Sequence, residues 1–446
     1  MSRELAIRPG ASASLATYPM SYEQESLWFE DQVSDAPSRY LESWACKLTG
    51  PVDIGALEWA ISQIAARHEV LRSQLTTRDG EPVQIVTPAS PVPVARVSCA
   101  PAALAAELTR ITAEPLDLDV APFRPWLVRV APDESVLAVQ FHHAIIDDWA
   151  FDLFQRELAH FYTASVLGQP ASLEPLPMQV GEYARVQRAA RMELADVAYW
   201  RRRVQGAPTW CTIPADRDRT EMAGHLAGQR VFRVSPELGR AVRAVSRARR
   251  TTPYTVFAAG TAVLLRQYRE NDEVIFGTPV SHRSAAAVDG MIGCLSDLLP
   301  IRLAITSDTS FADLVSIAKA EVLAALEHRA VPYSALVRMT RRRGAAATGR
   351  LCYAVLVVDD MRREPLSLPG ITAERIYVPP SRAKFDVCIT LVAGDDGGYT
   401  GFCDYESELY DPATMARVTT EFTELLASCT ANPDEPVTKL SRLSRD

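Results

Sequence analysis

The chain has 446 residues, of which 48% are hydrophobic and 23% are charged, and its formal net charge is −8. This length exceeds what one ordinary hydrophobic core needs, so we expect two domains with a cleft between them. The near-average composition excludes a fibrous or disordered protein, and the acidic balance argues against nucleic acid as a partner.

The eight cysteines occur singly, without a C-x-x-C pair, as expected for reduced thiols rather than for a zinc site. No run of about 18 apolar residues occurs, and the charged N-terminus is not followed by an apolar stretch. We therefore predict a soluble cytoplasmic protein that contacts no membrane and binds no metal.

The N-terminal segment, residues 1–17, is rich in alanine and serine without periodicity, which predicts a flexible arm. Beyond it, Ile54, Leu57, Ile61 and Ile64 recur at helical spacing. This spacing predicts a helix that faces the core.

The segment from Ser135 to His143 alternates as a β-strand does, so we expect His142 and His143 to point to opposite faces of a sheet. Asp147 and Asp148 follow, and both are good N-cap residues for a helix with an apolar stripe. The local unit is predicted to be a strand, a short loop and a helix.

Residues 168–177 are proline-rich and mark the passage to a second lobe, so we place the N-terminal lobe at 18–175 and the C-terminal lobe at 176–446. A long polar helix is predicted over 181–204. The mixed order of strands and helices supports α/β or α+β two-layer lobes, and periodicity alone does not choose between these classes. The second half is predicted to contain helices at 236–246, 254–268, 311–326 and from 411, and strands from 274 and at 352–358, 385–392 and 399–404.

The segment FHHAIIDDW, residues 141–149, is the most informative about chemistry. A neutral histidine with an ordinary pKa of about 6.5 can take a proton from an amine or hydroxyl, an effect worth about 10²- to 10⁴-fold in rate. The same residues also fit a histidine pair in the core and aspartates that only cap a helix. A metal site is less favoured, because neighbouring histidines on a strand diverge and no third ligand is spaced to join them.

The run HHAIIDDW, residues 142–149, resembles the HHxxxDG motif of the condensation domains of nonribosomal peptide synthetases, which belong to the chloramphenicol acetyltransferase-like superfamily. Further segments resemble family motifs in the right order, and the resemblance covers about residues 18–445. These segments are SYEQESLWF (21–29), RHEVLRSQL (67–75), EYA (182–184), IGCLSDLLPIR (292–302) and EHRAVPY (327–333).

The resemblance implies two chloramphenicol acetyltransferase-like lobes in a V-shaped pseudo-dimer around a central channel. A floor loop at 281–296 and a latch at 366–382 would belong to the C-terminal lobe. It also implies a stand-alone condensation enzyme of antibiotic or other natural-product biosynthesis, an acyltransferase that forms an amide or an ester. No cofactor would be bound. The acyl or peptidyl donor would arrive on the 4′-phosphopantetheine of a carrier protein in trans, and the acceptor would be a small amine or alcohol or a second carrier-bound group.

Position by position, His143 matches the family's functional histidine and His142 its supporting neighbour. Asp147 matches a structural aspartate, which the family pairs with an arginine that follows a G-x-P-V strand end. The run GTPV at 277–280 places Arg283 at that position. A buried pair of this kind would fix the two lobes at the site.

Asp148 departs from the pattern, because the family has glycine there. Its carboxylate would narrow the channel, recognise a cationic acceptor or cap the helix. Trp149 and Ser296 are further candidates for substrate binding, and RLCY at 350–353 lacks the family's asparagine–proline. Two other functions stay open: a coenzyme A-dependent acyltransferase of the same superfamily, and a catalytically decayed recruiting domain.

Overall fold

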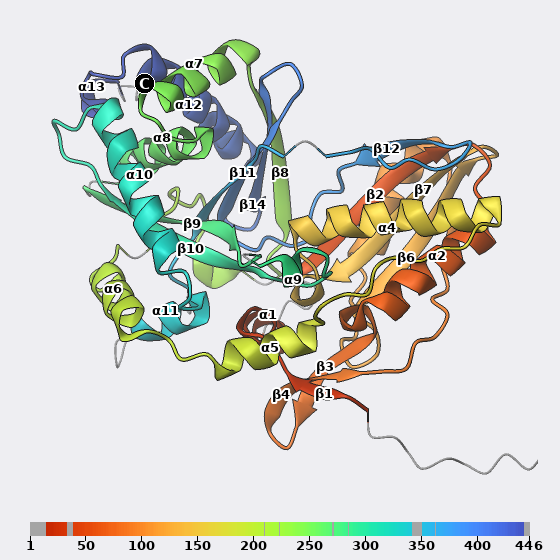
Figure 1. The fold of residues 1–446 in the computed structure, drawn as a ribbon. Helices are drawn as coiled ribbons and strands as arrows, with labels where there is room; N and C mark the ends of the chain where they lie inside the picture. Colours follow the sequence, from red (N-terminus) through yellow and green to blue (C-terminus); the bar gives the residue numbers. More distant parts are fainter. Residues whose placement is uncertain are drawn as a thin grey trace, which may run out of the picture.

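The computed structural model describes residues 15–33, 39–208, 210–222, 224–269, 272–283, 285–340, 350–361 and 363–440. They form two lobes, each built on its own β-sheet (Figure 1). Most of the predicted arm lies outside the described residues, and Thr17 already belongs to strand β1 (Thr17–Pro19). The mixed α/β fold class predicted from the sequence is confirmed.

The first lobe contains a five-stranded sheet with the order β12-β2-β7-β6-β5. Helices α2 and α4 lie along one face of this sheet in Figure 1, and α3 packs on the other face. These elements are β2 (Leu41–Thr49), α2 (Ile54–Arg67), β5 (Ala95–Ser98), α3 (Leu104–Thr112), β6 (Phe123–Ala131), β7 (Glu134–His142), α4 (Asp148–Leu167) and β12 (Thr372–Ile376).

The alternation of β7 explains how the sheet is covered on both faces. Leu137, Val139 and Phe141 pack in the core beneath α2 and α4, whereas Val136 and Ala138 pack in a second core beneath α3. Successive side chains of a strand point to opposite faces, so this one strand contributes to both cores. The same alternation sends the two histidines at its end in different directions.

A small three-stranded sheet with the order β1-β4-β3 adjoins the first lobe, next to α1 and α5 (Figure 1). Its neighbour α5 begins at Val180, which is buried in the first lobe's core. We placed the second lobe from residue 176, whereas this packing attaches α5 to the first. The elements are α1 (Tyr22–Val33), η1 (Glu69–Arg72), β3 (Ser73–Arg78), β4 (Glu81–Val86), η2 (Pro101–Ala103) and α5 (Val180–Ala189).

The single helix predicted over 181–204 is wrong. Two helices, α5 and α6 (Leu194–Val204), are separated by a short segment in which Ala190 is extended, with φ −68° and ψ 131°. Trp200 of α6 is buried in the second lobe's core, whereas α5 packs on the first. No glycine or proline interrupts this stretch, so packing on two different lobes determines the break.

The second lobe contains a six-stranded sheet with the order β10-β9-β11-β13-β14-β8, flanked by helices that include α7, α8, α10 and α12 (Figure 1). Its strands are β8 (Ala227–Val234), β9 (Glu273–Ser281), β10 (Ser296–Ala304), β11 (Ala354–Asp359), β13 (Val387–Ala393) and β14 (Tyr399–Glu406). Its helices are η4 (Arg219–Glu221), α7 (Pro236–Ala248), α8 (Pro253–Gln267), α9 (Ala286–Asp289), α10 (Phe311–Glu327), α11 (Tyr333–Thr340), α12 (Pro412–Ala431) and α13 (Val437–Leu440).

Two segments of the second half of the chain pack on the first lobe. Strand β12 pairs antiparallel with β2 at the edge of the first sheet, with Arg375 opposite Cys46, and Figure 1 shows the blue β12 beside the red-orange β2. Met291 and Leu295, from the predicted floor loop, are buried in the first lobe's core. Together these crossings hold the two lobes around the space between them. Among the described helices, none is long and apolar enough to span a membrane.

Candidate active site

A cavity of about 390 Å³ lies where the two lobes meet. The start of β2, His143 just after β7 and the start of α4 form one part of its wall, and β10, β12 and the segment after β12 form another. This is the place where the resemblance puts the channel. Charged or polar residues that line it include Glu42, His143, Asp148, Ser296, Asp297, Arg375 and Lys384.

His143 follows the last residue of β7 and opens the short helix η3 (His143–Ile145). Its backbone N–H donates to the Tyr40 carbonyl at 2.7 Å, and its Nδ1 lies 2.8 Å from the carbonyl oxygen of Ile146. A carbonyl can only accept, so Nδ1 carries the hydrogen and Nε2 keeps a lone pair. The ring can therefore accept a proton from a group in the cavity.

Glu42 and Lys384 surround this imidazole with opposite charges. Glu42 Oε1 lies 3.7 Å from His143 Nε2 and also forms an ion pair with Lys384. Burial lowers the pKa of His143, the positive charge of Lys384 lowers it further, and Glu42 opposes both effects. The imidazole is thus neutral at neutral pH, as a proton acceptor must be. Sequence reasoning missed both residues, because no spacing signal links positions so far apart.

His142 points away from the cavity and is 1% exposed. Its Nδ1 accepts a hydrogen bond from the backbone N–H of Ala144 at 3.1 Å, at the start of η3. Its Nε2 lies 3.9 Å from Asp31 and has no hydrogen-bond partner among the described residues. The arrangement gives His142 a part in the loop's structure and no access to a substrate.

We expect His142→Ala to lower the free energy of unfolding by about 1–3 kcal/mol, because the buried N–H of Ala144 loses its acceptor. His142→Asn is the matched control, since its side-chain oxygen can accept the same hydrogen bond and should restore part of the stability. Urea unfolding measures both variants. Unchanged stability together with lost activity would mean that the two histidines have each other's roles.

Asp147 is the N-cap of α4, with Oδ1 accepting from the backbone N–H of Ala150 at 2.9 Å. Its Oδ2 accepts from the backbone N–H of Leu295 at 3.0 Å and from the Ser296 hydroxyl at 3.3 Å. Asp147 as a whole residue is 2% exposed. It therefore joins the start of α4 in the first lobe to the start of β10 in the second.

The structure brings Arg283 to the same carboxylate, with Nη2 3.1 Å from Asp147 Oδ1. The guanidinium also donates to the carbonyls of Val288 and Met291, each at 2.7 Å, and to that of Gly293 at 3.2 Å. The guanidinium thus donates hydrogen bonds to three carbonyls of the predicted floor loop and forms an ion pair with the carboxylate that caps α4. Both side chains are nearly inaccessible, at 3% and 1%.

Asp148 does not cap the helix, although the sequence allowed that reading. It is the first residue of α4, and Asp147 before it provides the cap. Asp148 lines the cavity and is exposed to it. The enclosing walls, together with the negative charge of Glu42, raise the pKa of Asp148 to about 6. Its carboxylate is charged at pH 7 and faces the space where a substrate would lie.

Trp149, predicted as a substrate-binding candidate, is not among the residues that line the cavity. Its indole N–H donates to the carbonyl of Asp289 in α9 at 3.0 Å. One residue along a helix turns the side chain by about 100°, so Trp149 faces α9 while Asp148 faces the cavity. Ser296 does line the cavity, with its hydroxyl turned to Asp147.

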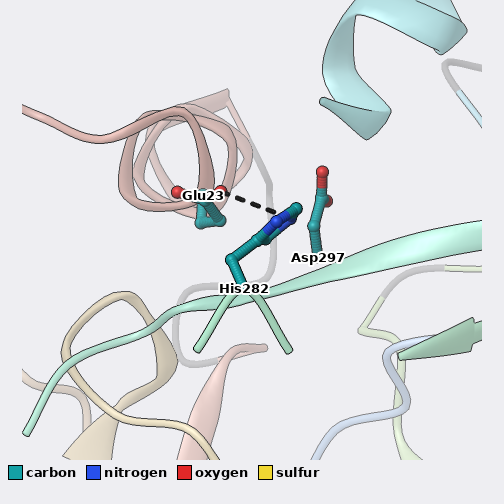
Figure 2. A group of neighbouring side chains, drawn as sticks. All are labelled: Glu23, His282 and Asp297. Atoms are coloured by element: carbon teal, nitrogen blue, oxygen red, sulfur yellow. Dashed lines mark ion pairs between the residues drawn. The ribbon is translucent and has the colours of Figure 1, made fainter. Parts of the chain in front are cut away.

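Glu23, His282 and Asp297 form a further cluster whose ligand atoms lie within 4.8 Å of one another. Figure 2 shows His282 beside Glu23, which comes from α1, and their side chains lie 3.9 Å apart. Burial and the charge of Glu23 raise the pKa of Asp297 to about 7, so a proton near neutral pH relieves the repulsion between the two carboxylates. Asp297 also accepts from the backbone N–H groups of Tyr333 and Leu298. The three residues are a group that could hold a metal ion, and the absence of a metal stays a prediction.

The sequence matches the condensation domain family over residues 14–446. The chain belongs to the condensation domain family. Among curated relatives of this condensation domain, phosphinothricin tripeptide synthetase PhsC of Streptomyces viridochromogenes is 31% identical over 442 residues, which is 96% of this chain and 40% of the relative. The chain therefore spans less than half the length of that synthetase.

Solved structures support the same condensation-domain fold. The X-domain from teicoplanin biosynthesis superposes with a TM-score of 0.88 at 24% identity and covers 99% of each chain. SgcC5 of Streptomyces globisporus gives a TM-score of 0.80 at 24% identity, covering 94% of this chain and 100% of its own. At these identities the likeness concerns the fold.

Proposed function

We propose that this condensation domain is an acyltransferase that moves an acyl group from a carrier-bound thioester to an amine or hydroxyl acceptor. The observation that carries the proposal is the orientation of the His143 imidazole. Its Nδ1 donates to the Ile146 carbonyl, which leaves the lone pair on Nε2 free to accept a proton in the cavity. The donor would be presented on the 4′-phosphopantetheine arm of a carrier protein. Membership in the family supports this choice of donor.

In the proposed reaction the acceptor nitrogen or oxygen attacks the thioester carbon and a C–N or C–O bond forms. His143 Nε2 takes the proton that the nucleophile loses, and Glu42 at 3.7 Å stabilises the imidazolium while it exists. The C–S bond then breaks, and the proton passes to the departing thiolate. Bonds and charges balance without any metal or redox group.

The carboxylate of Asp147 and the guanidinium of Arg283 contribute positioning. They fix the start of α4, which follows His143 in the chain, to the floor loop. A misplacement of reacting groups by about 1 Å can cost about 100-fold in rate, so such a clamp matters although it does not touch the substrate.

The test is an intact-mass assay of condensation with acyl groups loaded on a carrier protein and a panel of amines and alcohols. A parallel reaction supplies the same acyl groups as coenzyme A thioesters. Turnover from the carrier alone supports the proposal, and equal or better turnover from coenzyme A supports the coenzyme A-dependent alternative. No turnover from either donor would contradict both.

A recruiting function is the second candidate, because one matched structure is an X-domain in complex with OxyB, with a TM-score of 0.86. Two further observations bear on the choice. Asp148 replaces the family's glycine, which favours recruitment, whereas the cavity with its neutral His143 favours catalysis. A chain that only recruits would show no carrier-dependent turnover and would bind its partner equally well after His143→Ala.

We expect Asp148→Asn to raise the acceptor's KM by about 10-fold and to leave the donor's KM unchanged, because a charge-assisted contact is lost. The pKa of Asp148 is about 6, so the carboxylate is charged above that pH and neutral below it. The wild-type acceptor KM should therefore rise as the pH falls below about 6, while that of the variant stays flat. Steady-state kinetics at pH 5.5 and 7.5 measure both effects.

An acceptor KM that is unchanged in Asp148→Asn would contradict recognition of a cation by this residue. Asp148→Gly, which restores the family's residue, is the matched variant for the alternative that Asp148 narrows the channel. If Asp148 acts by narrowing the channel, the Asp148→Gly variant turns over bulky acceptors faster than the wild type, and the Asp148→Asn variant does not.

A further inference from the structure

Arg375 brings a positive charge into the wall of the cavity. It lies on β12, which crosses from the second half of the chain to the edge of the first sheet, opposite Cys46 of β2 (Figure 1). Its guanidinium carbon lies 5.5 Å from the ring centre of Trp44 and 5.9 Å from that of Phe151. The residue is exposed, and it lines the same cavity as His143 and Asp148.

Within the described part of the chain, Arg375 has no hydrogen bond and no ion pair with a carboxylate. The other cations of the cavity wall are engaged: Lys384 pairs with Glu42, Arg350 lies 3.8 Å from Glu30, and Arg382 donates to a backbone carbonyl. Arg375 differs from them: it lies against the rings of Trp44 and Phe151 and has no oxygen partner among the described residues.

Arg375 shares this part of the wall with a second cation and two carboxylates. Enclosure by the cavity walls and the positive charge of Arg363 lower the pKa of Arg375 to about 10, against the attraction of Asp152 and Asp148. Arg363 itself forms ion pairs with the carboxylates of Asp359 and Asp152, at 2.9 and 3.2 Å.

We propose that Arg375 binds the free carboxylate of the acceptor, and that the acceptor is an amino acid that is not loaded on a carrier protein. A guanidinium presents paired N–H donors that match the two oxygens of a carboxylate. Asp148 stands close enough for its charge to act on Arg375, so this part of the wall offers one anion and one cation to a zwitterion. The assignment to the acceptor rests on the proposed condensation function.

A free amino acid and a carrier-bound amino acid differ in the state of their carboxyl group. An amino acid on a carrier has its carboxyl group converted to a thioester and has no α-carboxylate to offer. The acyl donor has likewise lost its reacting carboxylate to the thioester. An unpaired arginine beside Asp148 thus favours an acceptor whose carboxyl group is still ionised.

The test measures binding rather than turnover, so it stays informative if condensation itself is not observed. Dissociation constants are measured by calorimetry on the full chain at pH 7.5 with matched pairs of ligands, the common α-amino acids and their α-carboxamides. We expect at least one acid to bind about 10-fold more tightly than its amide, as a charged contact predicts. Arg375→Gln should reduce that ratio to about one, and Arg375→Lys should keep part of it.

Arg230→Gln is the control, because this exposed arginine lies on β8, at the far edge of the second lobe's sheet. It should leave every ratio unchanged, and circular dichroism checks that each variant is folded. The proposal is overturned if no acid is preferred over its amide, or if the preference survives Arg375→Gln. Preference for the acid without any condensation would refute the proposed function and leave the carboxylate site in place.

Discussion

His143→Ala is expected to lower kcat/KM by at least about 100-fold with the fold retained, because the group that takes the acceptor's proton is removed. The side chain is half-buried, and among the described residues its hydrogen-bond partner is the Ile146 carbonyl, which cavity water can satisfy in the variant. Single-turnover rates with a loaded carrier protein measure the effect on chemistry directly. Near-normal rates in this variant would contradict the assignment.

His143→Asn is the matched control that separates two roles of His143, holding the loop in shape and accepting a proton. Its amide N–H can donate to the Ile146 carbonyl as Nδ1 does, so the loop keeps its anchor, but the amide cannot accept a proton at Nε2. If proton transfer matters, asparagine loses as much activity as alanine. If only the loop's shape matters, asparagine recovers most of it.

The pH dependence follows from the lowered pKa of His143. Burial and Lys384 keep that pKa below the ordinary value of 6.5, so the imidazole is neutral and competent above it and is lost as a base when it is protonated below it. With a hydroxyl acceptor, and in the Asp148→Asn variant, where residue 148 does not titrate, we expect kcat/KM to be flat between pH 7 and 8 and to fall only at a pH under 6.5. A change of kcat/KM with pH above pH 7 would mean that the titration of another group controls the rate.

The local chemistry of residues 141–149 could be predicted because it depends on short-range geometry. Strand alternation correctly separates His142, which is buried, from His143, which lines the cavity. The N-cap preference of aspartate correctly places the start of α4, although the sequence left open whether Asp147 or Asp148 caps it. Only the phase of the helix decides which aspartate caps it and which is exposed to the cavity.

Contacts between residues that lie far apart in the chain could not be predicted from sequence patterns. Glu42 meets Lys384 because β2 and the segment after β12 converge on His143, and nothing in either segment indicates its partner. Arg375 enters the cavity only because β12 crosses to the first sheet. The break between α5 and α6 likewise follows from packing on two lobes. The pairing of Asp147 with Arg283 was reachable through family resemblance, not through spacing.

Arg283→Ala is expected to lower the free energy of unfolding by about 3–5 kcal/mol, because it leaves the buried Asp147 carboxylate without its cation. The carbonyls of Val288, Met291 and Gly293 lose their shared donor at the same time. Guanidinium chloride unfolding, with circular dichroism as the signal, measures the loss. A change below about 1 kcal/mol, as for an exposed pair, would contradict the buried clamp.

A double-mutant cycle separates the ion pair from the other contacts of its partners. Asp147→Asn keeps an oxygen to accept from Ala150 and so preserves the cap of α4, but it removes the charge that Arg283 faces. If the pair acts as a unit, Asp147→Asn combined with Arg283→Ala destabilises by clearly less than the sum of the single variants, because the second change no longer strands a buried charge. Strict additivity would show that Arg283 stabilises the floor loop through its carbonyl contacts alone, and the carboxylate of Asp147 would then act through its hydrogen bonds with Ala150, Leu295 and Ser296.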